Sequence, residues 1–348
     1  MDSSNKPFIT IVLPCYNEQG ILQNNLNTII AYLETKSFKY RWEILIINDG
    51  SKDKTPDIAD EFSRNNPAIR VIHHPVNLNL GHALQTGFRN AKGDIIVVLD
   101  VDLSYAVEYI EQMVDKLIET SSDIVVASPY MKGGKVIAVP FLRRIMSKWV
   151  NRFMRMSAQD KYHTFTGMVR AYRRSFIRTL NLKTKDYEVN PEIMYKSMIL
   201  RARIVEIPAN LDWTEQNKFI TKRTSSIRVI RGFFSGIMSG FIFRPYIFFI
   251  GIGTILMLLS LYELIWLLHD TLADMKLARL QAPSDNDPFS YSLYLQFKKN
   301  PQSFIVGGVT FIAAIQFLSL GFLSLQSKRY FEELFHMGTS LKKQNENL

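Results

Sequence analysis

One stretch, residues 95–104, constrains the fold most, because an uninterrupted apolar run leads directly into two carboxylates. Residues 95–99 have the composition of a strand buried on both faces of a parallel sheet. If strand geometry continues, Asp100 and Asp102 share a face at the carboxyl edge, where open α/β sheets bind ligands. Carboxylate oxygens suit Mg²⁺ or Mn²⁺ together with phosphate oxygens, so the pattern predicts a metal-assisted diphosphate site. The alternative is an Asp-rich turn after a strand.

The composition is that of a globular chain with an apolar last third. The 348 residues suffice for two ordinary domains, or for one domain with membrane segments. The net charge of +10 is compatible with nucleic acid, anionic lipid or phosphorylated partners. Much of the excess lies at residues 143–244, beside the apolar runs, which favours lipid and phosphate over nucleic acid. The single cysteine, Cys15, excludes an internal disulfide, and residues 1–7 do not predict a signal peptide, so a cytosolic domain is expected.

Polar and aromatic residues follow two earlier strand-like segments. Residues 8–13 and 42–47 have the apolar composition of buried strands, and a third strand is expected at residues 69–73. Strands that alternate with helical patterns predict an α/β fold with a parallel sheet, whose carboxyl edge collects the residues following each strand. Those residues are Pro14, Tyr16, Glu18 and Asp49.

The first of these loops has two interpretations. Glu18 can accept a hydrogen bond from a ribose hydroxyl, and Tyr16 can flank a base. Alternatively, Asn17 and Glu18 cap the helix that is predicted to run from this loop to about Leu33.

Taken together and in order, five motifs resemble those of glycosyltransferase family 2. They lie at residues 13–18, 48–53, 79–81, 93–94 and 100–104. The resemblance covers residues 8–212, and it implies a GT-A (Rossmann-like) fold and a nucleotide-sugar donor. It further implies contacts of Pro14, Tyr16, Glu18, Asp49 and Asp100 with the donor nucleotide. By the same resemblance, a divalent metal (Mg or Mn) and the diphosphate are held by Asp100, Asp102 and Ser104.

A basic helix is predicted after residue 142. Arg143, Ser147 and Asn151 share one face of it at i, i+4 and i+8, and an arginine beside a hydroxyl suits a phosphate. The other interpretation, which is compatible with the first, is an amphipathic helix lying on a membrane. Members of the family that act on polyprenyl phosphate usually carry Asp where this chain has His163, and commonly Arg where it has Pro129.

Glu192 lies where family members that act on alcohols often keep a general base. Deprotonation of a hydroxyl needs a base, whereas a phosphate acceptor is already an anion. The alternative is that Glu192 contributes favourable electrostatics at the start of a helix. Lys222 and Arg223 are similar to the basic loop that covers the active site in the polyprenyl-phosphate group, which implies a contact with the acceptor phosphate.

Two apolar segments are long enough to span a membrane, since about 20 residues cross a hydrocarbon core. Basic residues outside the pair, such as Arg244 and Lys328, place both ends in the cytosol by the positive-inside rule. The expected organisation is a cytosolic GT-A domain at 1–215, a basic loop and amphipathic interface helix at 216–244, transmembrane helices at 245–268 and 304–326, an extracytoplasmic connection at 269–303 and a cytosolic tail at 327–348.

This domain plan resembles the membrane-anchored polyprenyl-phosphate glycosyltransferases, the group of dolichol-phosphate mannose synthase and its bacterial undecaprenyl-phosphate relatives. The predicted activity is inverting transfer of a sugar from a UDP- or GDP-sugar to undecaprenyl or dolichyl phosphate. Candidate catalytic residues are Asp102, Arg143 and Glu192. The expected partners are the nucleotide-sugar donor, a lipid-linked acceptor and membrane lipids, without nucleic acid, and a homo-oligomer is left open.

Two other functions are weighed against this one. The first is transfer to a neutral lipid hydroxyl with Glu192 as general base. The second is a non-catalytic membrane partner built on an inactive transferase, against which the carboxylates at Glu18, Asp49, Asp100 and Asp102 argue.

Overall fold

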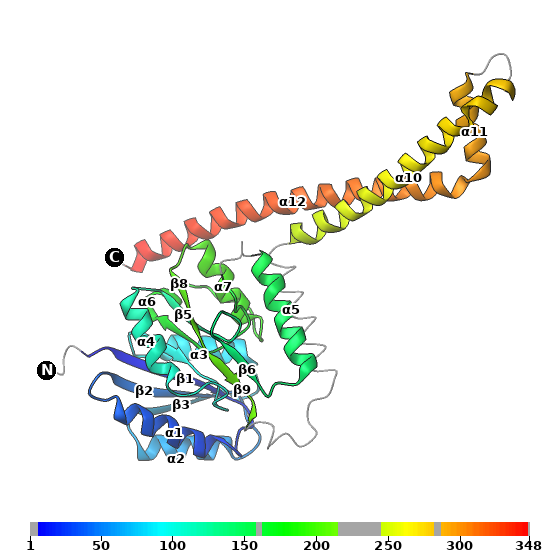
Figure 1. The fold of residues 1–348 in the computed structure, drawn as a ribbon. Helices are drawn as coiled ribbons and strands as arrows, with labels where there is room; N and C mark the ends of the chain where they lie inside the picture. Colours follow the sequence, from blue (N-terminus) through cyan, green and yellow to red (C-terminus); the bar gives the residue numbers. More distant parts are fainter. Residues whose placement is uncertain (1–5, 158–161, 215–244, 282–286, 347–348) are drawn as a thin grey trace. The chain divides into compact units, whose positions relative to one another are not determined.

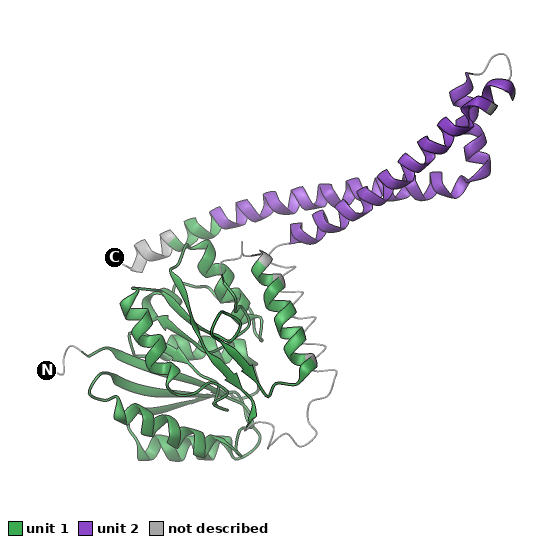
Figure 2. Cartoon of the chain, viewed as in Figure 1, with its two compact units in different colours: residues 1–240, 334–348 green, residues 241–333 purple. Residues whose placement is uncertain are grey.

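The computed structural model describes residues 6–157, 162–214, 245–281 and 287–346. The chain divides into two compact units, one of residues 1–240 with 334–348 and one of residues 241–333 (Figure 2). The amphipathic helix predicted at 216–244, with Lys222 and Arg223, lies outside the described residues.

The described part of the first unit is built on a seven-stranded sheet of order β3-β2-β1-β4-β7-β5-β8, with a two-stranded sheet β6-β9 (Figure 1). The strands are β1 (Phe8–Cys15), β2 (Arg41–Asn48), β3 (Ile69–His73), β4 (Ile95–Val98), β5 (Ile124–Ser128), β6 (Lys135–Ile137), β7 (Arg170–Arg173), β8 (Ile204–Pro208) and β9 (Asn210–Asp212). The predicted α/β class is therefore confirmed.

Strand register brings the ends of β1, β2 and β4 together. Cys15 lies opposite Asn48, and Val12 lies opposite Val98, all in parallel pairs. The loops that follow these three strands therefore leave the same edge of the sheet. Strand β7 runs antiparallel to both β4 and β5, which differs from a purely parallel sheet.

Helices cover both faces of the sheet. They are α1 (Leu22–Thr35), α2 (Thr55–Asn65), α3 (Leu80–Asn90), α4 (Tyr109–Glu119), α5 (Phe141–Ser157), α6 (Arg174–Ile177) and α7 (Val189–Ile199). One apolar cluster joins the sheet to α1, α2 and α4, and the other joins it to α3, α5, α6 and α7 (Figure 1). A Cβ on Gly87 would lie 2.5 Å from a Val12 methyl, so glycine there lets α3 approach β1 closely.

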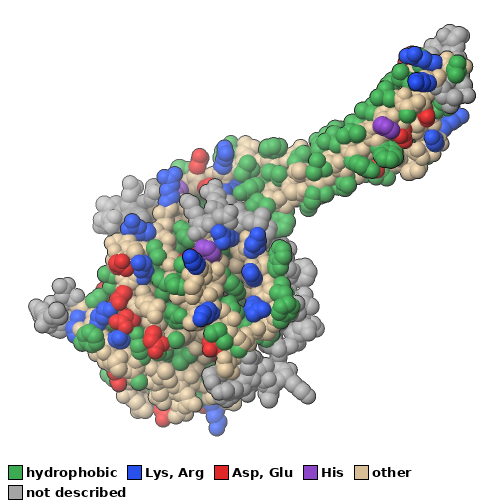
Figure 3. All heavy atoms as spheres, in the orientation of Figure 1, with side chains coloured by type: hydrophobic (Ala, Val, Ile, Leu, Met, Phe, Trp, Pro, Cys, Tyr) green, Lys and Arg blue, Asp and Glu red, His purple; other side chains and the backbone are tan. Residues whose placement is uncertain are grey.

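The second unit contains α10 (Pro245–Gln281), α11 (Pro288–Lys299) and the first part of α12 (Pro301–Glu346). Among the described residues, two helical segments, Pro245–Lys276 and Pro301–Thr339, are long and apolar enough to cross a membrane. Figure 3 shows hydrophobic side chains gathered along these helices. Both helices run past the expected span ends at 268 and 326.

The predicted connection between the spans is partly helical. Helix α11 packs on α10, where Ser292 donates to the Thr271 carbonyl at 2.6 Å and Gln296 donates to Asp274 at 2.7 Å. These polar contacts fasten the connection because each satisfies a donor that is largely removed from water.

Candidate active site

Three carboxylates from the first and fifth motif loops, Glu18, Asp100 and Asp102, influence one another electrostatically at the carboxyl edge. The pKa of Glu18 is raised to about 7, first by desolvation and then by the charges of Asp102 and Asp53. Burial also raises the pKa of Asp100, and Asp102 and Glu18 add to this, while Arg143 opposes the shift. The fold thus brings together four of the predicted site residues, and the cluster is short of positive charge.

The loop after β4 is a strained turn that involves the backbone of Asp100 and the side chain of Asp102. Ser104 donates its N–H to Asp102 Oδ1 at 2.9 Å, and Leu103 donates to the Asp100 carbonyl at 3.1 Å. Leu103 has φ +50°, a conformation that costs a non-glycine residue energy. The Asp-rich turn considered as an alternative is therefore present, and it coexists with the carboxylate cluster.

The first and second motif loops are tied together by hydrogen bonds. The Asn17 side chain accepts from Lys52 N at 2.9 Å, and Asn17 N donates to Ser51 Oγ at 3.0 Å. Glu18 N donates to Thr55 Oγ1 at 2.8 Å. Helix α1 begins only at Leu22 and has no side-chain cap, so the interpretation of Asn17 and Glu18 as side-chain caps is wrong. The Glu18 carbonyl instead accepts from Ile21 N at 3.1 Å and from Leu22 N at 2.9 Å, so it is the backbone of Glu18 that contacts the start of α1.

Asp49 lies buried at the end of β2, and Pro14 and Tyr16 lie at the end of β1. One oxygen of Asp49, Oδ1, accepts from His74 Nδ1 at 2.7 Å and from Leu78 N at 3.0 Å. Asp49 N donates to the Cys15 carbonyl at 2.9 Å, which sets the residue beside the turn to Tyr16. The Tyr16 side chain is 42% exposed, so its ring is available for stacking on a ligand.

Helix α5 supplies the cation that faces the carboxylates. The central carbon of the Arg143 guanidinium lies 4.2 Å from the centre of the Trp213 ring, within the range of a cation–π contact. One turn further on, Ser147 Oγ accepts from the Tyr130 hydroxyl at 2.7 Å. Sequence reasoning missed both Trp213 and Tyr130 as site residues. Tyr130 was detectable as an aromatic hydroxyl just past the carboxyl end of β5.

Asn151, the third residue on the predicted face of α5, makes structural hydrogen bonds within the domain. Its Oδ1 accepts from Phe165 N at 2.7 Å, and its amide donates to the Ser147 carbonyl at 2.9 Å and to Thr166 Oγ1 at 3.0 Å. A buried amide with these partners fastens the loop of residues 165–166 to α5.

Glu192 is buried inside a network of donors. Its carboxylate accepts from Lys183 N at 2.8 Å, Thr184 N at 2.9 Å and Lys196 Nζ at 2.5 Å, and also from the Thr184 hydroxyl. Desolvation opposes ionisation, but the hydrogen bonds from Lys196 and Thr184 keep its pKa below the ordinary value. A general base needs a reachable lone pair and a pKa near the working pH. The contacts show that the Glu192 carboxylate holds the backbone of residues 183–184 in place.

His163 also has a structural contact, which is with Glu206. Its N–H and its Nδ1 contact Glu206 Oε2 at 2.9 and 2.8 Å, and the neighbouring Thr164 N donates to Glu206 Oε1 at 2.8 Å. The Glu206 side chain is 6% exposed, so this pairing anchors the loop before β7 to β8.

The donor set of Asp100 and Asp102 fits a divalent cation. In the described ranges, no three or more His, Cys, Asp or Glu side chains are grouped so that they could hold a metal ion. Mg²⁺ in nucleotide enzymes takes only one or two carboxylates, with phosphate oxygens and water completing the shell. The raised pKa of Asp100 records desolvation and like-charge repulsion that a cation would relieve. Ser104 is buried and contributes the N–H that shapes the Asp102 turn.

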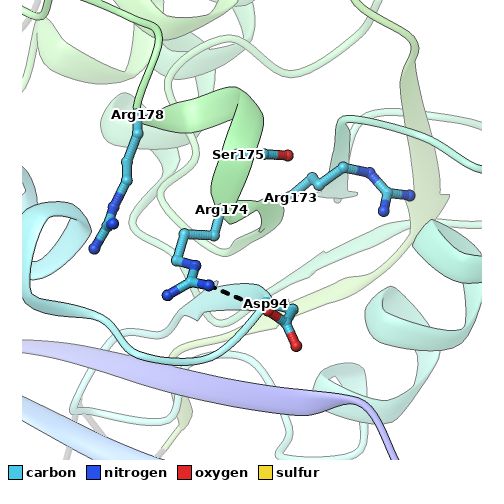
Figure 4. Close-up of a pocket in the computed structure, with 5 residues that line it drawn as sticks. All are labelled: Asp94, Arg173, Arg174, Ser175 and Arg178. Atoms are coloured by element: carbon cyan, nitrogen blue, oxygen red, sulfur yellow. Dashed lines mark hydrogen bonds and ion pairs between the residues drawn. The ribbon is translucent and has the colours of Figure 1, made fainter. Parts of the chain in front are cut away.

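A pocket of about 350 Å³ lies elsewhere, and Figure 4 shows its five lining residues. Asp94 precedes β4, so the pocket is at the opposite end of this strand from Asp100. Arg174 donates to Asp94 Oδ1 at 3.2 Å, and Arg178 donates to the carbonyls of Arg89 and Ala91 at 2.8 and 3.1 Å. These arginines secure the end of α3 to the sheet, and none of the predicted site residues lines the pocket.

The geometry agrees with the family to which this segment is related. Residues 10–180 match the model of Glycosyl transferase family 2. Glucosyl-3-phosphoglycerate synthase from Mycobacterium tuberculosis, solved with uridine diphosphate, has the same fold. The TM-score is 0.51 at 16% identity, over 69% of this chain and 80% of that one. The fold is therefore of the GT-A type.

Several curated proteins are similar in sequence to the same part of the chain. Dolichol-phosphate mannosyltransferase of Pyrococcus furiosus is 30% identical over 58% of this chain and 55% of that protein. Dolichyl-phosphate beta-glucosyltransferase ALG5A of Trichomonas vaginalis is 26% identical over 60% of this chain and 66% of its own length. Glycosyltransferase AglD of Haloferax volcanii is 28% identical over 59% of this chain and 33% of its own length. The chain thus spans between a third and two thirds of these relatives.

Proposed function

We propose that the protein is a membrane-bound inverting glycosyltransferase that moves a sugar from a UDP- or GDP-sugar to a polyprenyl phosphate. The observation that carries this proposal is the cluster of Glu18, Asp100 and Asp102 with Arg143 opposite, in a chain with two membrane-length helices. The dolichyl-phosphate glycosyltransferases among the relatives support the acceptor class.

On the donor side, Pro14, Tyr16, Glu18 and Asp49 would contact the nucleoside. Glu18 would accept from a ribose hydroxyl, and Tyr16, which is 42% exposed, would flank the base. Asp100 and Asp102, with the Ser104 turn, would hold the divalent cation and the diphosphate. When bound, that cation would neutralise the charge that develops on the leaving diphosphate.

On the acceptor side, Arg143 and Ser147 would hold the lipid phosphate. The guanidinium is a planar group with paired donors that suit phosphate oxygens, and its contact with the Trp213 ring supports its position. A phosphate oxygen is already an anion, so it attacks the anomeric carbon without a base, with inversion. Lys222 and Arg223, outside the described residues, would close over this phosphate.

The two membrane-length helices support an integral membrane protein with two passes. Arg244 before the first helix, with Lys328 and Arg329 after the apolar part of the second, favours a cytosolic catalytic domain and a cytosolic C-terminus. This arrangement would let the domain take its donor from the cytosol and its acceptor from the cytosolic leaflet of the membrane. In a prokaryote, this would be the plasma or inner membrane.

The function is tested by nucleotide release from a panel of UDP- and GDP-sugars by the purified full chain with Mg²⁺ or Mn²⁺. Each donor is assayed with undecaprenyl phosphate, with dolichyl phosphate, with a neutral polyprenol and without lipid. We expect release that requires both the metal and a lipid phosphate. Release with the polyprenol alone would point to the neutral acceptor, and the absence of any nucleotide binding would point to a non-catalytic partner.

A further inference from the structure

A chain of hydrogen bonds runs from helix α3 to the donor edge of the sheet. Thr86 Oγ1 lies 3.0 Å from His74 Nε2, and His74 Nδ1 lies 2.7 Å from Asp49 Oδ1. The side chains of His74 and Asp49 are 8% and 5% exposed, so the interaction is largely shielded from water. A hydrogen bond to a carboxylate in such surroundings restricts its orientation strongly.

The chemistry of the partners assigns the proton on the ring. A carboxylate oxygen only accepts, so His74 Nδ1 carries the hydrogen that bonds to Asp49, and Thr86 satisfies the other ring nitrogen. Leu78 N is the second donor to the same oxygen. In the part of the chain that the structure describes, these hydrogen bonds all fall on Oδ1, which leaves Oδ2 of Asp49 for a ligand.

The backbone around Asp49 is closely packed. Gly50 has φ +66°, and a Cβ on it would lie 2.3 Å from the Val76 carbonyl carbon. Residues 76–78 therefore wrap against the end of β2 and deliver Leu78 N to the carboxylate. The position of Asp49 is therefore set by its contacts with the Cys15 carbonyl, the His74 side chain and Leu78 N.

We propose that His74 is a positioning residue of the donor site, which holds Asp49 by Oδ1 so that Oδ2 faces the central ring nitrogen of the base edge. This rests on the proposed function, in which Asp49 contacts the nucleoside. An oxygen that only accepts favours a base with a ring N–H at that point, as in uracil or guanine. Cytosine and adenine present a lone pair there, and the two lone pairs repel. The site would therefore select UDP or GDP over CDP and ADP.

The test is binding of UDP, GDP, CDP and ADP to the full chain with Mg²⁺, measured by calorimetry. For the wild type, we expect UDP or GDP to bind at least about tenfold more tightly than CDP or ADP. H74L should reduce this preference by about tenfold, because Asp49 loses the donor that orients it. H74N should restore most of it, since the Asn amide places an N–H near the position of Nδ1, whereas H74Q should not.

Two further variants sharpen the test. D49N should raise the affinity for CDP relative to UDP, because an amide can donate to the ring nitrogen of cytosine. The matched control is H73L, whose histidine contacts Asn48 at 2.9 Å and Asp60 at 3.0 Å and should leave base preference unchanged. If H74L cannot be obtained folded, the contrast between H74N and H74Q replaces it.

The outcomes separate this inference from the function on which it rests. If the wild type binds none of the four nucleotides, the proposed donor site fails. If the wild type discriminates and H74L discriminates equally well, the role of His74 alone is overturned. A uniform loss of affinity for all four nucleotides in H74L would also overturn it, because such a loss reports a general structural role.

Discussion

At the scale of single residues, the loops of the candidate site adopt backbone conformations that L-residues seldom take. Asn17, Asn79 and Leu103 have φ of +57°, +70° and +50°, and each lies in one of the motif loops. Such conformations cost on the order of 1 kcal/mol each and persist only when the surroundings impose them. The side-chain hydrogen bonds of Asn17 and Asp102 are part of what imposes them here.

The most direct residue-scale prediction concerns Asp102. D102N should lower the transfer rate by about 100-fold or more, because the carboxylate proposed to hold the cation and the diphosphate loses its charge. The thermal midpoint should stay at the wild-type value, since the amide oxygen can still accept from Ser104 N. D57N, at an exposed position in α2, is the matched control and should keep full activity. Full activity of D102N would remove Asp102 from the mechanism.

A second residue-scale prediction concerns pH and Glu18. Its pKa of about 7, raised from 4.5, means that the folded state holds the proton more tightly than the unfolded state. Stability is therefore lost as pH rises from about 4.5 to about 7, by about 3 kcal/mol at most. Thermal midpoints of the metal-free chain from pH 5 to pH 8 measure this. E18Q should make the profile shallower, with a remaining slope from Asp100, whose pKa is also raised. An equally steep profile in E18Q would contradict the assignment.

At the scale of elements, α7 carries a buried ion pair between Glu192 in its first turn and Lys196 in its last turn. Because Glu192 pairs with Lys196 inside the protein, E192Q leaves a buried cation without its carboxylate. We expect a loss of about 3 kcal/mol in stability, while the rate of the folded fraction falls less than tenfold. Thermal unfolding and kcat are measured on the same preparation.

The double variant E192Q/K196M is the control for this pair. It should recover part of the stability, because the unpaired charge is removed together with its partner. A collapse of kcat in E192Q at an unchanged thermal midpoint would instead identify Glu192 as a base, and transfer to a neutral hydroxyl would then be favoured.

Helices α10 and α12 approach closely at two glycines. A Cβ on Gly253 would lie 2.9 Å from Leu318 Cγ, and one on Gly321 would lie 2.6 Å from Ile250 Cγ1. G253L should therefore lower the thermal midpoint in detergent by forcing the helices apart, at a cost of about 1–3 kcal/mol. G251L is matched to it, since a Cβ on Gly251 meets nothing within 4 Å. Equal midpoints for the two variants would contradict this packing.

At the scale of the whole molecule, the proposed topology predicts which sites face the cytosol. Cys15 is buried, so C15S provides a background for single-cysteine labelling. In intact cells, K298C should react with an impermeant maleimide and K342C should react only after lysis. Labelling of K342C in intact cells, or protection of K298C, would contradict the proposed two-pass topology.

Sequence alone predicted the features that depend on local pattern. The apolar run at residues 95–99 identified a central strand, and the carboxylates after it were placed at the edge because parallel strands end together. The lengths of the two apolar segments predicted membrane-spanning helices, since a hydrocarbon core of about 30 Å sets a minimum length. These conclusions need only residue type and spacing.

Tertiary structure decided how contacts distant in sequence are made. Strand β7 inserts antiparallel between β4 and β5, and nothing in its own pattern fixes its direction. The partner of Arg143 is Trp213, that of Asp49 is His74, and that of Glu192 is Lys196. The residue type made Glu192 a candidate base, but burial and four donors removed its free lone pairs. Such partnerships depend on packing, because a side chain's chemistry is set by the groups that the fold places against it.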